Sequence, residues 1–150
     1  MATPTTSEDK RKHLELAQAV ITRMSSNSFL FKGWSITLVA AISAFAAKDT
    51  NRALMTIPVV STLLFWAIDS YYLMLERAFR NIYNDVVTKD PDTIDYNLTP
   101  ANVDKTFKAW VKVICRPLLV GFYGVVLIML IILLLILNHV SLSVKVNHGA

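Results

Sequence analysis

The chain has 150 residues, a formal net charge of +4 at pH 7, 54% hydrophobic residues and 17% charged residues. That charged share lies below the roughly 25% of an ordinary soluble domain, and the apolar residues gather in three blocks, 33–47, 53–75 and 118–137. The last block carries no charge over about 20 residues, the length that crosses a hydrocarbon core of roughly 30 Å. So short a chain could not bury such a helix on all sides. Composition therefore excludes a soluble globular domain and predicts an all-α membrane protein.

Several classes of site are excluded by the residue inventory. The single cysteine, Cys115, cannot form an intramolecular disulfide, and the three histidines are scattered without metal-ligand spacing. No nucleophile elbow, phosphate-binding loop, HExxH or CxxC pattern occurs. The first 28 residues hold four basic residues and no apolar run, so we expect no cleavable signal peptide. We expect neither an enzyme nor a bound cofactor.

The basic residues predict the orientation. Twelve of the fifteen lie within residues 1–32 or 76–116, and the other three are Lys48, Arg52 and Lys145. The positive-inside rule then predicts a multi-pass protein of the cell (inner) membrane. It would have three transmembrane helices, with the N-terminus in the cytoplasm and the C-terminus outside.

The N-terminal third is expected to form one cytoplasmic helix that continues into the first span. After a lead over residues 1–7, Thr5 and Glu8 fit a capping box. An amphipathic helix over 8–32 follows, and a helix lying flat on the bilayer is the alternative. The first span, 33–47, is rich in small residues, which allow close helix packing in lipid. Residues at heptad spacing form a seam along one face of the 8–32 helix. They are Leu14, Ala17, Ile21, Met24, Ser28 and Phe31.

The second span, 53–75, continues into a cytoplasmic stalk helix over 76–88 without a helix-breaking residue at the junction. We expect this stalk to run antiparallel to the 8–32 helix, because both seams have the same period. Two isolated stalks would bury little area, so bundling with neighbouring subunits, in a homo-oligomer, would help. The stalk seam consists of Tyr72, Leu75, Phe79, Ile82 and Val86.

Asp69 is the one formally charged residue between Arg52 and Glu76, and an ionisable group at membrane depth usually has a partner. Lys32 lies 16 residues before Lys48, and Asp69 lies 17 residues after Arg52. At 1.5 Å per residue both fall roughly 25 Å from the turn between the two spans. We therefore predict that Lys32 and Asp69 pair, within a subunit or across a boundary, as an intramembrane and gating site. The alternative is that Lys32 snorkels alone and Asp69 faces a wet crevice.

The second half of the chain is expected to return to the membrane. Asp90-Pro91 breaks the stalk and opens a loop over 89–98. A basic amphipathic helix over 99–116 follows, with Thr99 as N-cap and Pro100 in its first turn, lying at the membrane surface among lipid headgroups. The third span, 117–138, has Tyr123 as its polar handle and is expected to face lipid. A loosely ordered tail covers 139–150. The apolar face of the 99–116 helix would be Val103, Phe107, Trp110 and Ile114.

Basic residues on the cytoplasmic side would form a positively charged mouth if subunits assemble around an axis. Such a mouth would attract an anion, for example a nucleotide or a single-stranded oligonucleotide, through phosphate contacts. The positive-inside bias alone also produces this excess of charge. The candidate anion-binding residues are Arg23, Arg77, Arg80, Lys105, Lys108 and Lys112.

Two segments carry a resemblance to known proteins. The first is His13-Leu14 through Gln18, Val20-Ile21, Arg23-Met24, Asn27-Ser28-Phe29 and Lys32-Gly33-Trp34, and the second is Asp69-Ser70-Tyr71-Tyr72-Leu73, Glu76-Arg77, Phe79-Arg80 and Tyr83. Together, over about half the chain, they resemble a family of small, mostly uncharacterised bacterial membrane proteins. The layout is similar to membrane effectors of anti-phage defence systems such as the Hailong type. The resemblance implies a membrane-disrupting oligomer controlled by an oligonucleotide or by the product of a nucleotidyltransferase partner.

These patterns favour a homo-oligomeric gated ion pore. Two alternatives remain: a non-conducting membrane anchor or adaptor that recruits a soluble partner, and a holin-like lytic protein. Polarity along the spans is the feature that separates them, because a pore needs a lining. The residues available for that lining are Ser35, Thr37, Ser43, Thr56, Ser61, Thr62 and Asp69.

Overall fold

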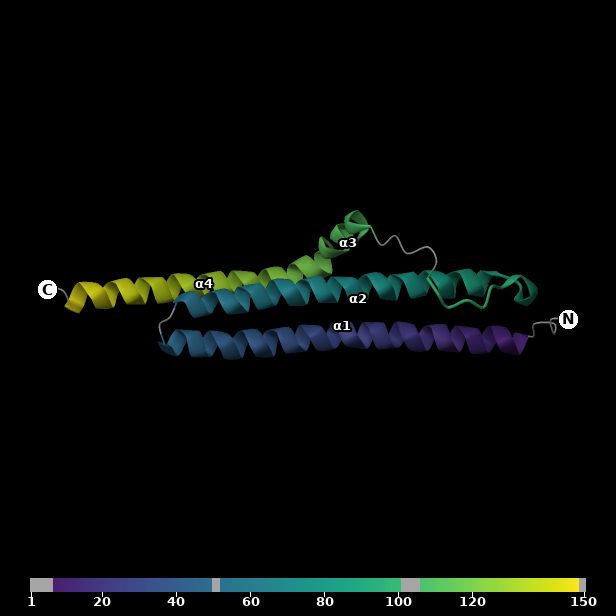
Figure 1. The fold of residues 1–150 in the computed structure, drawn as a ribbon, viewed down its shortest axis with the longest axis horizontal. Coiled ribbons are helices and arrows are strands. Elements are labelled where there is room, and N and C mark those ends of the chain that lie inside the picture. Colours follow the sequence, from purple (N-terminus) through teal and green to yellow (C-terminus); the bar gives the residue numbers. More distant parts are fainter. Residues whose placement is uncertain (1–6, 50–51, 101–105, 149–150) are drawn as a thin grey trace. The chain divides into compact units, whose positions relative to one another are not determined.

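A computed structural model describes residues 7–49, 52–100 and 106–148, and these contain helices and no strand. Three of the helices are long and apolar enough to cross a membrane, so the all-α class is confirmed and the chain is a multi-pass membrane protein. The elements in chain order are α1 (Ser7–Asp49), the 3-10 helix η1 (Arg52–Met55), α2 (Thr56–Thr88), the 3-10 helix η2 (Pro91–Thr93), α3 (Phe107–Ile114) and α4 (Pro117–His148) (Figure 1).

Contacts divide the chain into two compact units. Unit 1 joins Met1–Phe29 to Ser70–Val113, and unit 2 joins Leu30–Asp69 to Ile114–Ala150. Because α1 and α2 are uninterrupted across these boundaries, each of them contributes to both units. Unit 1 holds the segments predicted to be stalks, and unit 2 holds most of the predicted spans.

Unit 1 contains an antiparallel pair of helices that bury part of each predicted seam; in the stalk seam Val86 is buried, and Tyr72, Leu75, Phe79 and Ile82 are half-buried. Ala17 and Ile21 of α1 and Val86 of α2 are buried, as expected for apolar side chains repeating every three or four residues. Lys10 closes the end of this pair. Its Nζ donates to the backbone carbonyl oxygens of Val87 (3.1 Å) and Lys89 (2.7 Å), which the last turn of α2 leaves without intrahelical partners.

The segment after α2 folds back over α1 in unit 1. Ile94 is buried, and the Tyr96 ring meets the buried His13 ring edge-on, with the ring centroids 5.3 Å apart. Partial burial raises the pKa of Tyr96 above its ordinary value, and the charges of Asp9 and Asp92 raise it further. The loop predicted over 89–98 therefore contains a packed strap. No sequence pattern predicts this contact, because its residues lie more than 80 positions apart.

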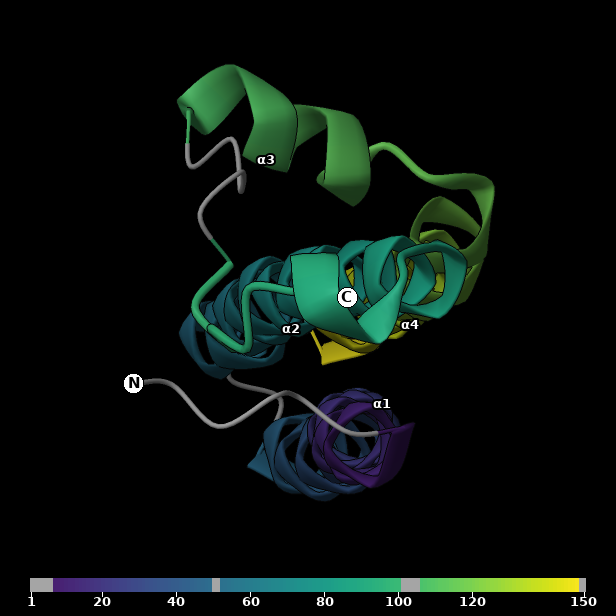
Figure 2. The ribbon, with the colours of Figure 1, turned by 90° about the vertical axis from the view of Figure 1, so that its right-hand side faces the viewer.

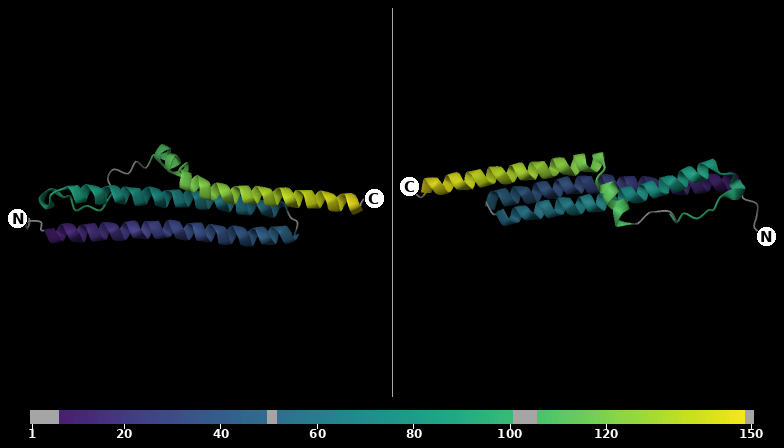
Figure 3. Two further views of the ribbon diagram at one scale, coloured as in Figure 1. Left: turned by 180° about the vertical axis from the view of Figure 1, so that it is seen from behind. Right: turned by 90° about the horizontal axis from the view of Figure 1, so that it is seen from above.

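Unit 2 contains parts of three helices. The second half of α1 and α4 run in the same direction, and the first half of α2 runs against them (Figures 1 and 3). An ion pair joins α1 to α2 and a hydrogen bond joins α4 to α2, while α1 and α4 line a common groove, so the three helices form a triangle in cross-section (Figure 2). Large apolar side chains such as Phe45 (70% exposed) and Ile128 (57%) point outward, as expected for helices surrounded by lipid tails.

The prediction of a helix over 99–116 is wrong at its start. Thr99, Pro100 and Thr106 are not helical, and α3 begins at Phe107; Val103 and Lys105 lie outside the described residues. The cause is local. The backbone N–H of Asn97 donates to Asp95 Oδ1 (3.2 Å), and that of Thr99 donates to Asn97 Oδ1 (2.8 Å). Such turns, made by short polar side chains, compete with helix formation.

Other boundaries differ less. The second span was predicted from residue 53, but η1 occupies 52–55 and α2 begins at Thr56. The tail, expected to be loosely ordered from 139, continues α4 to His148, since no Pro or Gly interrupts the sequence after Gly124 until Gly149. The capping box of Thr5 and Glu8 falls partly outside the described residues.

Candidate functional site

The site is centred on Asp69, which lies on α2 in unit 2 and is fully buried. Lys32 of α1 reaches it: Lys32 Nζ lies 2.6 Å from Asp69 Oδ2, and the lysine side chain is 19% exposed. The two residues meet because they lie at similar distances from the end of α1 at Asp49 and the start of η1 at Arg52, on antiparallel helices. The structure thus brings these two predicted residues together within one chain.

Tyr123 of α4 is the third member of the site. Its hydroxyl donates to Asp69 Oδ2 (3.2 Å) and lies 3.4 Å from the Phe65 carbonyl oxygen, and its side chain is fully buried. We call Lys32, Asp69 and Tyr123 the Asp69 cluster. From the sequence, we predicted the first two residues as a site and noted Tyr123 only as the polar residue of the third span. Its isolation as the one polar side chain in an apolar span was the available signal, because a lone hydroxyl in lipid needs a partner.

Trp66 holds α4 in register with this cluster. Its indole stacks on the Tyr123 ring, with centroids 5.7 Å apart and planes 11° from parallel. Its Nε1 donates to the backbone carbonyl oxygen of Ile114, at 3.2 Å. The stacking joins α2 to α4, and the hydrogen bond joins α2 to the last residue of α3, just before α4 begins.

The cluster resolves an electrostatic problem set by the sequence. A charged side chain at the centre of a membrane helix costs about 2.5–3.5 kcal/mol on insertion scales. Here opposite charges meet at hydrogen-bond distance, and the phenol donates to the same carboxylate oxygen that the ammonium group contacts. Removing one member of a buried pair costs about 3–5 kcal/mol, because the remaining charge is left uncompensated. The cluster is therefore a strong lock between three helices.

Further polar side chains lie on the same face of α1 as Lys32. Ser28, Ser35 and Ser43 are buried; Ser28 lies four residues before Lys32, and Ser35 and Ser43 lie three and eleven residues after it, so all of them are on the inner face. The hydroxyls of Ser35 and Ser43 have no hydrogen-bond partner. On α2, the buried Thr62 donates to the Pro58 carbonyl oxygen at 2.7 Å. Of the predicted lining residues, Ser35, Ser43, Thr62 and Asp69 are thus buried within one chain, Ser61 is half-buried, and Thr37 and Thr56 are exposed.

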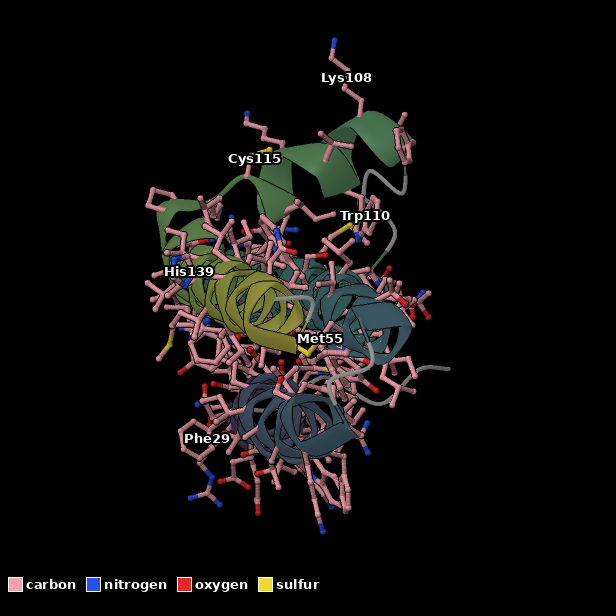
Figure 4. The ribbon with its side chains drawn as sticks, turned by 90° about the vertical axis from the view of Figure 1, so that its left-hand side faces the viewer. Phe29, Met55, Lys108, Trp110, Cys115 and His139 are labelled. Atoms are coloured by element: carbon pink, nitrogen blue, oxygen red, sulfur yellow. The ribbon has the colours of Figure 1, made fainter. Side chains whose placement is uncertain are left out.

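The predicted anion-binding residues belong to unit 1, and they differ in exposure and in the contacts they make. Arg80 Nε donates to Glu76 Oε1 at 2.8 Å, so one donor of its guanidinium group is already used. Lys108 extends away from α3 (Figure 4). Arg23, Lys108 and Lys112 are exposed and Arg77 is half-buried, while Lys105 lies outside the described residues. Exposed cations on these helices are available to a solution anion.

Potential metal ligands do not cluster in the described ranges. Across 7–49, 52–100 and 106–148, no group of three or more His, Cys, Asp or Glu side chains could hold a metal ion. Cys115 is free and exposed. What the Asp69 cluster can do is hold helices together and release them when its charges are separated.

Comparison with protein-family models, with curated proteins and with solved structures gives no match for this chain.

Proposed function

We propose that this protein is a homo-oligomeric membrane protein that conducts ions, and that the Asp69 cluster holds it closed. The observation that carries the proposal is the 2.6 Å ion pair between Lys32 and Asp69 inside the membrane-spanning part of the chain. Intramembrane ionisable residues mark ion and proton pathways more often than they serve packing alone. A pore between copies would be lined by polar side chains exposed on one copy, and Thr37 and Thr56 fit that requirement.

The pore would open when the Lys32–Asp69 ion pair separates. α1 and α2 extend from the Asp69 cluster into unit 1, where Lys10 and the 90–98 strap hold them. An anion that binds the exposed basic side chains of unit 1 better in one packing of these helices would shift the population toward that packing. The ligand acts by differential binding, and the ion pair is the bistable contact that it biases.

The resemblance stated above extends the proposal to cellular role. The protein would act in a bacterial inner membrane with its N-terminus in the cytoplasm, as an effector of anti-phage defence. Its ligand would be a nucleotide or oligonucleotide supplied by a nucleotidyltransferase-like partner. A phage-plating assay with and without the gene, and with Asp69→Asn, measures this role separately from conduction.

The test of conduction is reconstitution into liposomes. We expect wild-type protein to migrate as an oligomer and to carry a small potassium flux, and the Lys32→Met variant, which removes the ion pair that holds the pore closed, to carry a larger one. Lys48→Met, which removes an exposed lysine at the far end of α1, is the matched control and should leave the flux unaltered. Protein that stays monomeric and passes no ions would refute the proposal.

A second candidate is a non-conducting anchor or adaptor. The observation that favours it is that Lys32, Asp69 and Tyr123 satisfy one another within a single chain, so no pore is needed to accommodate the charge. Unit 1 would then recruit a soluble partner. This reading requires an unchanged membrane potential on overexpression and a partner that co-purifies with the wild-type protein but not with variants altered on unit 1.

A further inference from the structure

Unit 2 carries an apolar groove between α1 and α4 that the Asp69 cluster does not use. Its volume is about 640 Å³, and it opens to the outside of the helices. Small residues create it, because Ala40 and Gly121 stand where larger side chains would close the gap. A Cβ added at Gly121 would meet no atom within 4 Å. The groove is lined from α1 by residues including Ile36, Ala40 and Ser43, and from α4 by residues including Gly121, Val125 and Leu133.

An open apolar groove in a bilayer does not stay empty. Atoms that line a void lose dispersion contacts on one side, and lipid tails are the surrounding solvent. The lining on α4 runs from Gly121 to Leu133, which at 1.5 Å per residue is about 18 Å. One leaflet of a hydrocarbon core of roughly 30 Å is about 15 Å deep. The groove therefore has the length of a single acyl chain.

A basic residue precedes the part of α4 that lines this groove. Arg116 lies five residues before Gly121, immediately before the apolar stretch that starts at Pro117. It is exposed, and among the described residues no ion pair is formed by it. An arginine at the junction of a span with its polar flank lies at headgroup depth, and a guanidinium binds phosphate through paired hydrogen bonds.

We propose that this groove binds one acyl chain of an anionic phospholipid whose phosphate contacts Arg116. This lipid would stay bound to the protein instead of exchanging with the surrounding bilayer, because its acyl chain lies between two helices and its phosphate is held by the charge of Arg116. It would also fill the gap between α1 and α4, beside the Asp69 cluster. The proposal does not depend on ion conduction.

The competing occupant is a helix of a second copy. Small residues at a helix surface allow such an approach, and Ser43 would be its mark. The Ser43 side chain is 8% exposed and its hydroxyl has no partner, so a neighbouring helix could supply an acceptor. An acyl chain cannot, and the hydroxyl would then turn to a carbonyl of its own helix. Ser43→Ala separates the two occupants: it leaves lipid binding unchanged but weakens a helix–helix contact.

The experiment is native mass spectrometry of the full chain from detergent, with an equimolar mixture of dioleoylphosphatidylglycerol and dioleoylphosphatidylcholine as the probe. We expect one phosphatidylglycerol per chain to survive conditions that strip the remaining lipid. Arg116→Gln should lower the preference for phosphatidylglycerol about fivefold, since a basic residue near the surface contributes on the order of 1 kcal/mol. Lys48→Gln removes the same charge from the other end of α1 and should leave the preference unchanged.

Groove-filling variants test the acyl chain. Ala40→Leu should remove the retained lipid of either headgroup, whereas Ala41→Leu, at an exposed neighbouring alanine that does not line the groove, should keep it. Equal effects of Arg116→Gln and Lys48→Gln would overturn the headgroup assignment, and lipid retained by Ala40→Leu would overturn the groove. If Ala40→Leu or Ser43→Ala instead lowers the number of chains per particle, the groove belongs to a second copy. Helix content by circular dichroism checks that each variant folds.

Discussion

The two units are built from the same pair of helices, yet different forces hold each together. In unit 1, α1 and α2 bury apolar side chains that include Ala17, Ile21 and Val86, together with polar ones such as His13 and Glu76, and Lys10 binds carbonyl oxygens at the exposed end. Unit 2 is held together differently. The polar Asp69 cluster is buried at the centre, and large apolar side chains such as Phe45 and Ile128 point outward.

We infer that this difference between the units follows from their surroundings, which are water for unit 1 and lipid for unit 2. In water, apolar side chains drive two helices together, at about 25 cal/mol for each square ångström buried. In lipid that force vanishes between helices, because a lipid tail is as apolar as leucine, and packing and interhelical hydrogen bonds take its place. Removing a polar side chain should therefore lower the free energy of unfolding most in unit 2 and only slightly at the exposed end of unit 1. The predictions below test that contrast.

The largest effect is expected from Lys32→Met. The variant leaves the Asp69 carboxylate buried without its cation, so the free energy of unfolding should fall by about 3–5 kcal/mol. Unfolding in mixed micelles by a denaturing detergent measures it. Lys48→Met, at an exposed lysine of the same helix, is the control and should be near neutral. A Lys32→Met protein as stable as wild type would show that the ion pair contributes nothing to holding the helices.

An exchange of charges should recover part of that loss. Lys32→Asp and Asp69→Lys alone each place two like charges together, whereas the double variant restores opposite charges at the same depth. We expect a coupling free energy of about 1–3 kcal/mol in a double-mutant cycle. Recovery should be incomplete, since the Tyr123 hydroxyl loses its acceptor on Asp69. Additive single effects would mean that the two side chains do not interact in the folded protein.

The ion pair could be predicted from the sequence, and the place of α4 could not. Lys32 and Asp69 lie on helices joined by a short turn, so the rise per residue alone fixes their relative depth. α4 follows a long connection from α2 and is apolar on every side, so its sequence specifies neither its neighbour nor its rotation. Tyr123 is the exception, and its contact with Asp69 depends on the tertiary arrangement.

The same distinction explains the errors elsewhere. The seams of unit 1 were predictable because heptad spacing is a local property of each helix. The start of α3 was mispredicted because Asp95 and Asn97 form local turns that override the helix signal of Thr99-Pro100. The strap contact between His13 and Tyr96 joins distant residues without a repeating pattern, and no spacing rule predicts such a contact.

A smaller effect is expected from Tyr123→Phe. The variant keeps the ring that stacks on Trp66 and removes only the hydroxyl that donates to Asp69. Interhelical hydrogen bonds in membranes contribute about 0.6 kcal/mol on average and up to about 1.7, so the free energy of unfolding should fall within that range. Tyr71→Phe, at an exposed tyrosine of α2, is the control. A loss as large as that of Lys32→Met would show that the phenol, rather than the lysine, is the main partner of Asp69.

The smallest effect is expected from Lys10→Met, which removes the hydrogen bonds to the Val87 and Lys89 carbonyl oxygens in unit 1. These contacts are exposed, and exposed charged contacts contribute at most about 1 kcal/mol. We expect global stability to be nearly unchanged, while the last turn of α2 frays and its backbone amides exchange hydrogen faster, by up to about fivefold. Lys12→Met, at an exposed lysine two residues away, should leave exchange unaltered. If Lys10→Met instead destabilised the protein as much as Lys32→Met, polar contacts would matter equally in both units, and the contrast drawn between water and lipid would fail.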